Sequence, residues 1–200
     1  MILDRFYPIV DSAAWAARLV GVGARLIQLR MKDKDEATIL SETREALAIC
    51  RSAGGQLIVN DYWRVAIEAG ADFVHLGQGD LDGADMAAIR AHGLKVGIST
   101  HDEAELARAL ALAPDYVALG PIYPTILKAM AFAPQGLARI GEWKRRVGAI
   151  PLVAIGGLNV ERGKACLAAG ADVVSVVTDI TLNADPEGRA REWIAATRAP

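Results

Sequence analysis

Short apolar runs alternate along the chain with longer, alanine-rich stretches in which apolar residues recur at helical spacing. The short runs do not alternate strictly between apolar and polar residues, which indicates strands that are buried on both faces and connected in parallel by the helices. The strands are expected at Phe6–Val10, Arg25–Arg30, Leu57–Asn60, Phe73–Leu76, Lys95–Ser99, Tyr116–Leu119, Leu152–Ile155 and Val173–Val177. The helices are expected at Ala13–Val20, Glu36–Arg51, Trp63–Glu68, Ala84–Ala91, Glu103–Leu112, Gly136–Arg146, Glu161–Ala168 and in a last segment that ends near Ala196.

A weak internal repeat accompanies this alternation. The segment Gly70–Gly77 resembles Gly170–Val177, with echoes at Gly23–Ile27 and Ala113–Gly120. Each copy has a Gly or Pro that ends a helix, a tight turn and then a strand. Eight such units in 200 residues predict an α/β protein with one (β/α)8 TIM-barrel domain over residues 1–200. The alternative is a doubly wound open sheet, but Asp11–Trp15 lacks the glycine-rich turn that such a fold has after its first strand.

The composition limits the classes of partner. With 22 basic and 24 acidic residues the net charge is −2, so no global field attracts nucleic acid or an anionic membrane, and an anion site has to be local. Cys50 and Cys166 lie in predicted helices and match no metal-ligand spacing, so we expect reduced, buried thiols. The first residues do not resemble a signal peptide, and no apolar run approaches about 18 residues. We therefore expect a cytoplasmic protein that acts on small molecules, with a homo-oligomer left open.

Polar residues gather at the predicted carboxyl ends of the strands, where barrel enzymes carry their active sites. Gln28, Arg30 and Lys32 are spaced two residues apart and share one face of an extended strand. Two unpaired cations on a covered face would cost several kcal/mol each, so we expect an anion to meet them.

The other polar strand ends allow more than one interpretation. Asp61 and Asp80 suit helix caps or ion-pair partners of the two cations, but two carboxylates beside cations also suit Mg²⁺ with a substrate phosphate. The pair Gly156-Gly157 lets backbone N–H groups approach an anion, or merely makes a turn. Lys128, on the same loop as Thr125, is either part of a lid over an anion or a solvated lysine.

These residues describe two anion sites at one barrel mouth. A cationic site with two candidate metal carboxylates suits a pyrophosphate, and a site of glycines and hydroxyls suits a single phosphate. That layout favours a transferase over a hydrolase, since no nucleophilic triad is evident. His75, His92 and His101 have no partner at metal-ligand spacing and are expected to be structural or solvated.

Taken in order, these motifs resemble those of the thiamine phosphate synthase family from about Tyr7 to Trp193. The motifs are Gln28–Lys32, Asn60-Asp61, His75–Asp80, Gly97–Ser99, Gly120–Thr125, Lys128 and Ala154–Gly157. The resemblance implies a (β/α)8 barrel that joins hydroxymethylpyrimidine pyrophosphate to hydroxyethylthiazole phosphate and releases pyrophosphate, with Mg²⁺ required. It also implies that the C–O bond breaks before the thiazole nitrogen attacks.

By position, the resemblance implies a role for each site residue. The pyrimidine pyrophosphate would contact Gln28, Arg30, Lys32, Asn60, Ser99 and Lys128, of which Arg30, Lys32, Ser99 and Lys128 would act on the departing pyrophosphate. Asp61 and Asp80 would hold the metal. The thiazole phosphate would bind Thr125, Gly157, Val177 and Thr178.

Two positions depart from the family pattern. Leu127 stands where the family usually has a second threonine, which removes a hydroxyl, and Thr178 replaces a usual serine but keeps its hydroxyl. Two other functions stay open. One is that of the sister thiazole tautomerases, which do not need the residues for pyrophosphate and metal. The other is that of a non-catalytic barrel that binds a thiazole phosphate.

Overall fold

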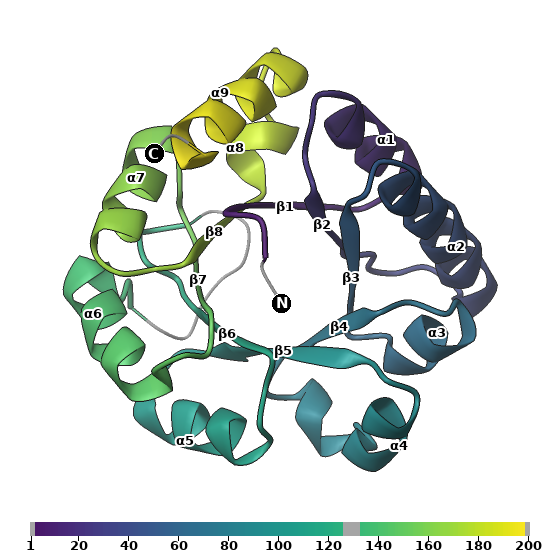
Figure 1. The fold of residues 1–200 in the computed structure, drawn as a ribbon, viewed down its shortest axis with the longest axis horizontal. Coiled ribbons are helices and arrows are strands. Elements are labelled where there is room, and N and C mark those ends of the chain that lie inside the picture. Colours follow the sequence, from purple (N-terminus) through teal and green to yellow (C-terminus); the bar gives the residue numbers. More distant parts are fainter. Residues whose placement is uncertain (1–2, 126–132, 199–200) are drawn as a thin grey trace.

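The computed structural model describes residues 3–125 and 133–198. Within them, eight parallel strands close into a barrel, with β1 bonded to both β2 and β8 (Figure 1). The strands are β1 (Phe6–Val10), β2 (Leu26–Leu29), β3 (Gln56–Asn60), β4 (Phe73–Leu76), β5 (Lys95–Thr100), β6 (Tyr116–Leu119), β7 (Leu152–Ile155) and β8 (Val173–Val176). The predicted (β/α)8 barrel is confirmed, and the open sheet is wrong because its edge strands would not be bonded to each other.

Helices surround the barrel and connect its strands (Figure 1). They are α1 (Ala13–Gly21), α2 (Glu36–Ser52), α3 (Trp63–Glu68), α4 (Met86–Ala91), α5 (Glu103–Ala111), α6 (Gly136–Val147), α7 (Val160–Ala168), α8 (Thr178–Thr181) and α9 (Pro186–Arg198). The short helix α8 and a 3₁₀ turn at Asp80–Asp82 were not predicted, because both are too short to show a helical period. Strand β2 was predicted one residue too long at each end, and Arg30 follows the strand.

Polar side chains fix where most of the longer helices begin. In five helices an Asp, Ser or Asn at the N-cap accepts a hydrogen bond from the backbone N–H three residues later, which satisfies one free donor of the first turn. These caps are Ser12, Asp35, Asp85, Asp102 and Asn159. Such a cap contributes about 1 kcal/mol to stability.

The apolar residues form two cores. The outer core lies between the strands and the helices, and it includes both free cysteines, Cys50 and Cys166. Both thiols are free and buried, as predicted, and burial raises the pKa of each to about 11. The inner core fills the barrel and contains Tyr7, Phe73 and Tyr116. The barrel centre is therefore a packed core and not a pore.

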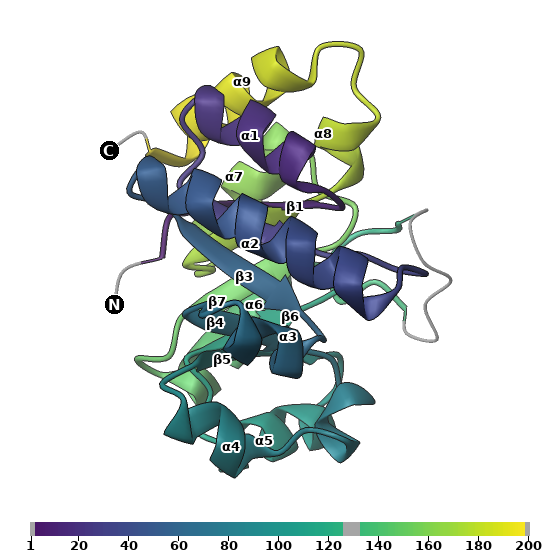
Figure 2. The ribbon, with the colours of Figure 1, turned by 90° about the vertical axis from the view of Figure 1, so that its right-hand side faces the viewer.

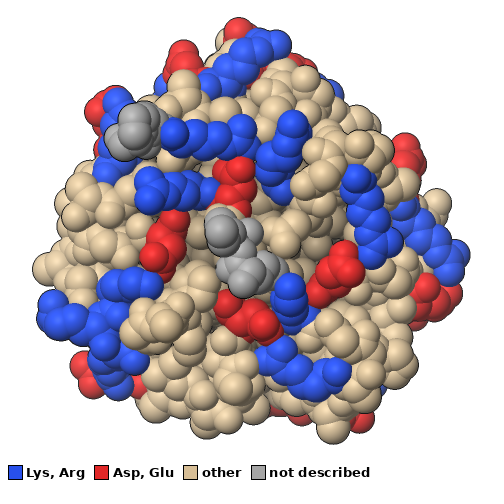
Figure 3. Space-filling view, viewed as in Figure 1, with Lys and Arg blue, Asp and Glu red and all other residues tan. Residues whose placement is uncertain are grey.

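The aspartates of the internal repeat have a structural role at the amino ends of the strands. Asp115 Oδ2 accepts from Val96 N (2.8 Å) and from Arg90 Nη1 (2.6 Å), and Asp172 Oδ2 accepts from Leu152 N (2.7 Å) and Lys144 Nζ (2.6 Å). Figure 3 shows basic and acidic side chains interspersed over this face. The carboxyl ends of the strands lie at the opposite end of the barrel, away from the two termini (Figure 2).

Candidate functional site

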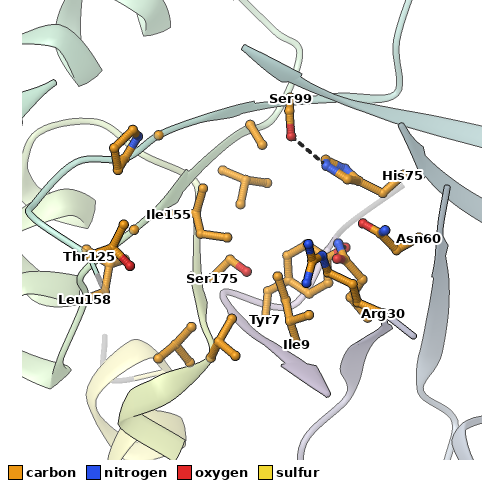
Figure 4. Close-up of a pocket in the computed structure, with 18 of the residues that line it drawn as sticks. Tyr7, Ile9, Arg30, Asn60, His75, Ser99, Thr125, Ile155, Leu158 and Ser175 are labelled. Carbon is orange, nitrogen blue, oxygen red and sulfur yellow. Dashed lines mark hydrogen bonds between the residues drawn. The ribbon is translucent and has the colours of Figure 1, made fainter. Parts of the chain in front are cut away.

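A cavity of about 420 Å³ opens at the carboxyl ends of the strands, a volume that suits a small organic ligand. Among the residues that line it are nine that the sequence predicted: Gln28, Arg30, Lys32, Asn60, Ser99, Thr125, Gly157, Val177 and Thr178. Figure 4 shows Arg30 and Asn60 on one side of the cavity, with Thr125 and Leu158 on the other. The predicted residue Lys128, and Leu127 beside it, lie outside the described residues.

One wall of the cavity is cationic. The alternation of side chains continues past the end of β2, so that Gln28, Arg30 and Lys32 all line the cavity while Met31 is buried against the outer core. Among the described residues, no hydrogen bond or ion pair engages the Arg30 guanidinium. Arg30 is therefore available to an anion, whereas Lys32 bonds to Asp61 at 2.7 Å.

Two carboxylates lie beside this wall. The side chains of Asp61 and Asp80 are close enough to interact, and partial burial together with the neighbouring Asp61 raises the pKa of the Asp80 carboxyl above its ordinary value. Asp80 Oδ2 also accepts a bond from Gly77 N at 3.1 Å. Two neighbouring carboxylates repel each other unless a proton or a cation lies between them. The Asp61–Asp80 pair is thus suited to a cation.

The backbone at Asp61 is held in an uncommon conformation. Its φ is +65°, and the following N–H groups of Tyr62 and Trp63 bond back to Asn60 O and Asp61 O, each at 2.8 Å. A positive φ costs energy for a residue other than glycine and persists where the surrounding structure imposes it, often at functional sites. This turn aims the Asn60 and Asp61 side chains in different directions, Asn60 into the cavity and Asp61 toward Lys32.

The opposite wall is made by the segments that follow β6 and β7. Ile122 N bonds to Ile155 O (2.9 Å) and Tyr123 N to Gly156 O (3.1 Å), so the two segments are joined. Gly156 and Gly157 both have a positive φ. A Cβ at Gly156 would lie 2.6 Å from Pro121, and a Cβ at Gly157 would lie 2.3 Å from Pro124 O. The glycine pair is therefore required by this contact, and it also lines the cavity.

A buried relay of five side chains crosses the barrel below the cavity. Gln28 Nε2 donates to Tyr7 Oη (2.7 Å), Tyr7 Oη lies 3.0 Å from Tyr116 Oη, Tyr116 Oη lies 2.7 Å from His75 Nδ1, and His75 Nε2 lies 2.8 Å from Ser99 Oγ. The last of these bonds is drawn in Figure 4. Burial, with a smaller effect of Arg30, lowers the pKa of His75 to about 4, so the imidazole is neutral near pH 7.

The relay contains residues that the sequence did not single out. His75, expected to be structural or solvated, is buried and lines the cavity, and the sequence pattern predicts Tyr7 and Tyr116 only as strand residues. The sequence signal that could have revealed these three residues is a hydroxyl or imidazole group at an inward-facing position of β1, β4 and β6. Ser175 on β8 is a further unpredicted lining residue, and its buried hydroxyl has no hydrogen-bond partner among the described residues.

The closed barrel, with polar groups converging on a cavity at the carboxyl ends of its strands, defines a class of barrel enzymes that act on small ligands. A family model described as thiamine monophosphate synthase matches residues 5–180. The chain therefore belongs to the thiamine monophosphate synthase family, and it is an enzyme of thiamine biosynthesis.

Similar proteins agree with this assignment. The chain is 61% identical to the thiamine-phosphate synthase of Rhizobium etli, covering 98% of this chain and 97% of that protein. It is 48% identical to the thiamine-phosphate synthase of Salmonella newport, over 96% of this chain and 87% of that protein. The fold matches the thiamine phosphate pyrophosphorylase of Pyrococcus furiosus with a TM-score of 0.87, at 24% identity and with coverage of 97% and 95%. Within the described part of the chain, no helix combines the length and apolarity needed to cross a membrane.

Proposed function

We propose that this enzyme joins hydroxymethylpyrimidine pyrophosphate to hydroxyethylthiazole phosphate in a Mg²⁺-dependent reaction that yields thiamine phosphate and pyrophosphate. The observation that carries the proposal is that one cavity has two walls of different chemistry. Arg30 and Lys32 line one side, with the Asp61–Asp80 pair next to Lys32, and Thr125 and Gly157 line the other. Such a cavity suits two phosphorylated substrates held with their reacting rings between them.

The cationic wall suits the pyrophosphate. Arg30 is unpaired among the described residues, and its guanidinium can bind two phosphate oxygens at once. Asn60 and Ser99 add an amide and a hydroxyl on the same cavity. Lys128, by its position in the sequence, is proposed as a further cation for the same group.

The donor set beside this wall fits Mg²⁺. This ion is usually held by one or two carboxylates together with substrate phosphates and water, and Asp61 with Asp80 supplies two carboxylates next to the proposed pyrophosphate. When bound, Mg²⁺ would neutralise charge on the departing pyrophosphate. The pKa of Asp80 is raised first by partial burial and then by the neighbouring Asp61 carboxylate, and a bound cation would relieve the repulsion between the two carboxylates.

The opposite wall suits the single phosphate of the thiazole. Thr125 and Thr178 offer hydroxyls, and Gly157 and Val177 offer backbone groups. A phosphate in this position would lie across the cavity from Arg30 (Figure 4).

The proposed reaction needs little acid–base chemistry from the protein. The electron pair of the C–O bond leaves with the pyrophosphate, and the lone pair of the thiazole nitrogen then forms the new C–N bond, so no proton has to be removed from the nucleophile. Arg30, Lys32 and Ser99 would stabilise the charge that develops on the leaving group. Apolar lining residues such as Ile9 and Val153 would limit the access of water to the cation formed in between.

The test is direct. Purified protein is mixed with both substrates and Mg²⁺, and thiamine phosphate and pyrophosphate are measured with and without EDTA. We expect both products in equal amounts and their loss with EDTA. An Arg30→Gln variant should lose most turnover, whereas Arg44→Gln, which removes an exposed cation paired with Glu68 on the outer surface, should not. No product above a protein-free control would overturn the proposal, and isomerisation of a thiazole without any second substrate would indicate a tautomerase instead.

A further inference from the structure

The hydrogen bonds of the buried relay have a preferred donor-to-acceptor direction, which follows from the protons that each group can donate. The amide nitrogen of Gln28 can only donate, so Tyr7 Oη accepts from it. The single proton of Tyr7 can then bond to Tyr116, the proton of Tyr116 to His75 Nδ1, and the proton on His75 Nε2 to Ser99 Oγ. In this direction the hydroxyl protons of both tyrosines and the ring proton of His75 each have an acceptor.

The opposite direction leaves a proton unsatisfied. If Tyr116 donated to Tyr7, then Tyr7 would accept two bonds and its own proton would have no acceptor among the described residues, although only 1% of Tyr7 is exposed. Buried hydroxyls without an acceptor are rare because they lose their bonds to water.

We propose that Tyr7, Tyr116 and His75 are positioning residues that fix the direction in which the Ser99 hydroxyl donates. His75 Nε2–H occupies Ser99 Oγ as an acceptor, so the proton of Ser99 is left to point into the cavity, toward an anionic oxygen. The inference rests on the proposed function, in which Ser99 contacts the departing pyrophosphate. Ser99 is also held through its backbone, because Gln78 Nε2 donates to Ser99 O at 2.7 Å.

The packing of the barrel keeps the relay in place. The Tyr116 ring stacks on His75 with an interplanar angle of 13° and meets the edge of Tyr7 at 88°. Gly97 on the neighbouring strand leaves room for the ring, since a Cβ there would lie 2.0 Å from Tyr116 Cζ. The position of the Tyr116 hydroxyl is therefore set by its surroundings and not by free rotation of the side chain.

The kinetic test uses Tyr116→Phe, which keeps the ring and removes the hydroxyl. We expect kcat to fall by about 10-fold, the value of one hydrogen bond to a developing charge, with KM for the thiazole phosphate unchanged. Ser99→Ala should show a similar loss, and the double variant should be no slower than Ser99→Ala alone, because Tyr116 acts through Ser99. Thr197→Val is the matched control, since it removes a buried hydroxyl bonded to Trp193 O in α9; its kcat should match wild type.

Losses that multiply in the double variant would overturn the proposal, as would an unchanged kcat in both Tyr116→Phe and Tyr7→Phe. A second measurement needs no activity. In ¹⁵N-labelled wild-type protein, whose three histidines are assigned with His92→Gln and His101→Gln variants, His75 should be neutral with its proton on Nε2. A proton on Nδ1 would reverse the relay and overturn the proposal. A wild-type enzyme without turnover would count against the proposed function, whereas the direction of the relay would still be decided by the NMR result.

Discussion

Lys32 Nζ donates a hydrogen bond to Asp61 Oδ2 across 2.7 Å and joins the segment after β2 to the end of β3. The lysine side chain is 49% exposed, and exposed ion pairs of this kind contribute little to stability. The pair is better explained by the proposed reaction. In the free enzyme Lys32 neutralises one of two neighbouring carboxylates, and on binding of a metal and a pyrophosphate it would turn to a phosphate oxygen.

Asp61→Asn should impair the proposed metal and pyrophosphate site and leave the proposed thiazole phosphate site intact. We expect turnover to fall on the order of 100-fold, because an amide is a weak ligand for Mg²⁺, with nearly unchanged affinity for the thiazole phosphate. Asparagine tolerates the positive φ at this position, so the turn should persist. Product formation and calorimetric titration with thiazole phosphate provide the two readouts.

A chemically matched control for this variant is Asp82→Asn, which removes an exposed carboxylate paired with Arg108. It should leave both readouts unchanged. If Asp61→Asn reduces turnover and thiazole phosphate affinity equally, Asp61 is a structural residue.

The fold was predictable because a barrel strand is covered on both faces. Buried runs such as Phe73–Leu76 carry continuous apolar residues, and the repeated Gly-Ala-Asp turns mark where strands begin. The elements that the sequence did not predict are short. Helix α8 has four residues and the turn at Asp80–Asp82 three, both below the length at which hydrophobic periodicity is visible.

The site was predictable where polar residues interrupt apolar strand ends, as at Gln28, Arg30 and Asn60. Tyr7 and Tyr116 were not predictable as polar site residues, because an aromatic ring in a strand is typical of an apolar core, and only the folded structure shows that their hydroxyls lie 3.0 Å apart. The role of Gly156 was likewise hidden, since its contact with Pro121 joins segments from two different strands.

Acid should destabilise the protein through His75. Its pKa is about 4 in the folded state, mainly because of burial, against 6.5 for an ordinary histidine. Between these pH values the unfolded chain binds more protons than the folded one, so the free energy of unfolding falls as pH drops through this window, by up to about 3 kcal/mol. Above pH 6.5 the residue is neutral in both states and contributes no slope.

Urea unfolding at pH 7 and at pH 4.5 measures this effect, with His75→Gln as the comparison. The variant lacks the titration, so the difference in stability between wild type and His75→Gln should shrink toward pH 4.5. A difference that stays constant with pH would show that other groups cause the acid sensitivity.

Asp115→Asn should weaken the barrel at its amino end without affecting turnover. Asp115 bonds to Arg90 and to Val96 N, and its side chain is 28% exposed, so we expect a loss of about 1 kcal/mol in the free energy of unfolding. Urea unfolding gives the loss, and Glu68→Gln, in an exposed pair with an N···O distance of 3.4 Å, should change it by less than about 0.5 kcal/mol. Equal effects would mean that the charge of Asp115 contributes no more than the charge of an exposed ion pair.

Ser175→Ala should weaken substrate binding without lowering stability. The Ser175 hydroxyl is buried, lines the cavity near Tyr7 and has no partner among the described residues, so the folded protein loses no hydrogen bond with it (Figure 4). We expect the free energy of unfolding to stay the same or rise by about 1 kcal/mol, because an unpaired buried hydroxyl is unfavourable. Because this hydroxyl faces the cavity, we expect it to bond to a polar atom of the pyrimidine, so KM for that substrate should rise about 5- to 10-fold in the variant. Thr43→Val is the matched control, since Thr43 Oγ1 is also buried without a partner but lies in α2, away from the cavity. The control should reproduce the effect on stability and leave KM unchanged, and an unchanged KM in Ser175→Ala would mean that the substrate does not use this hydroxyl.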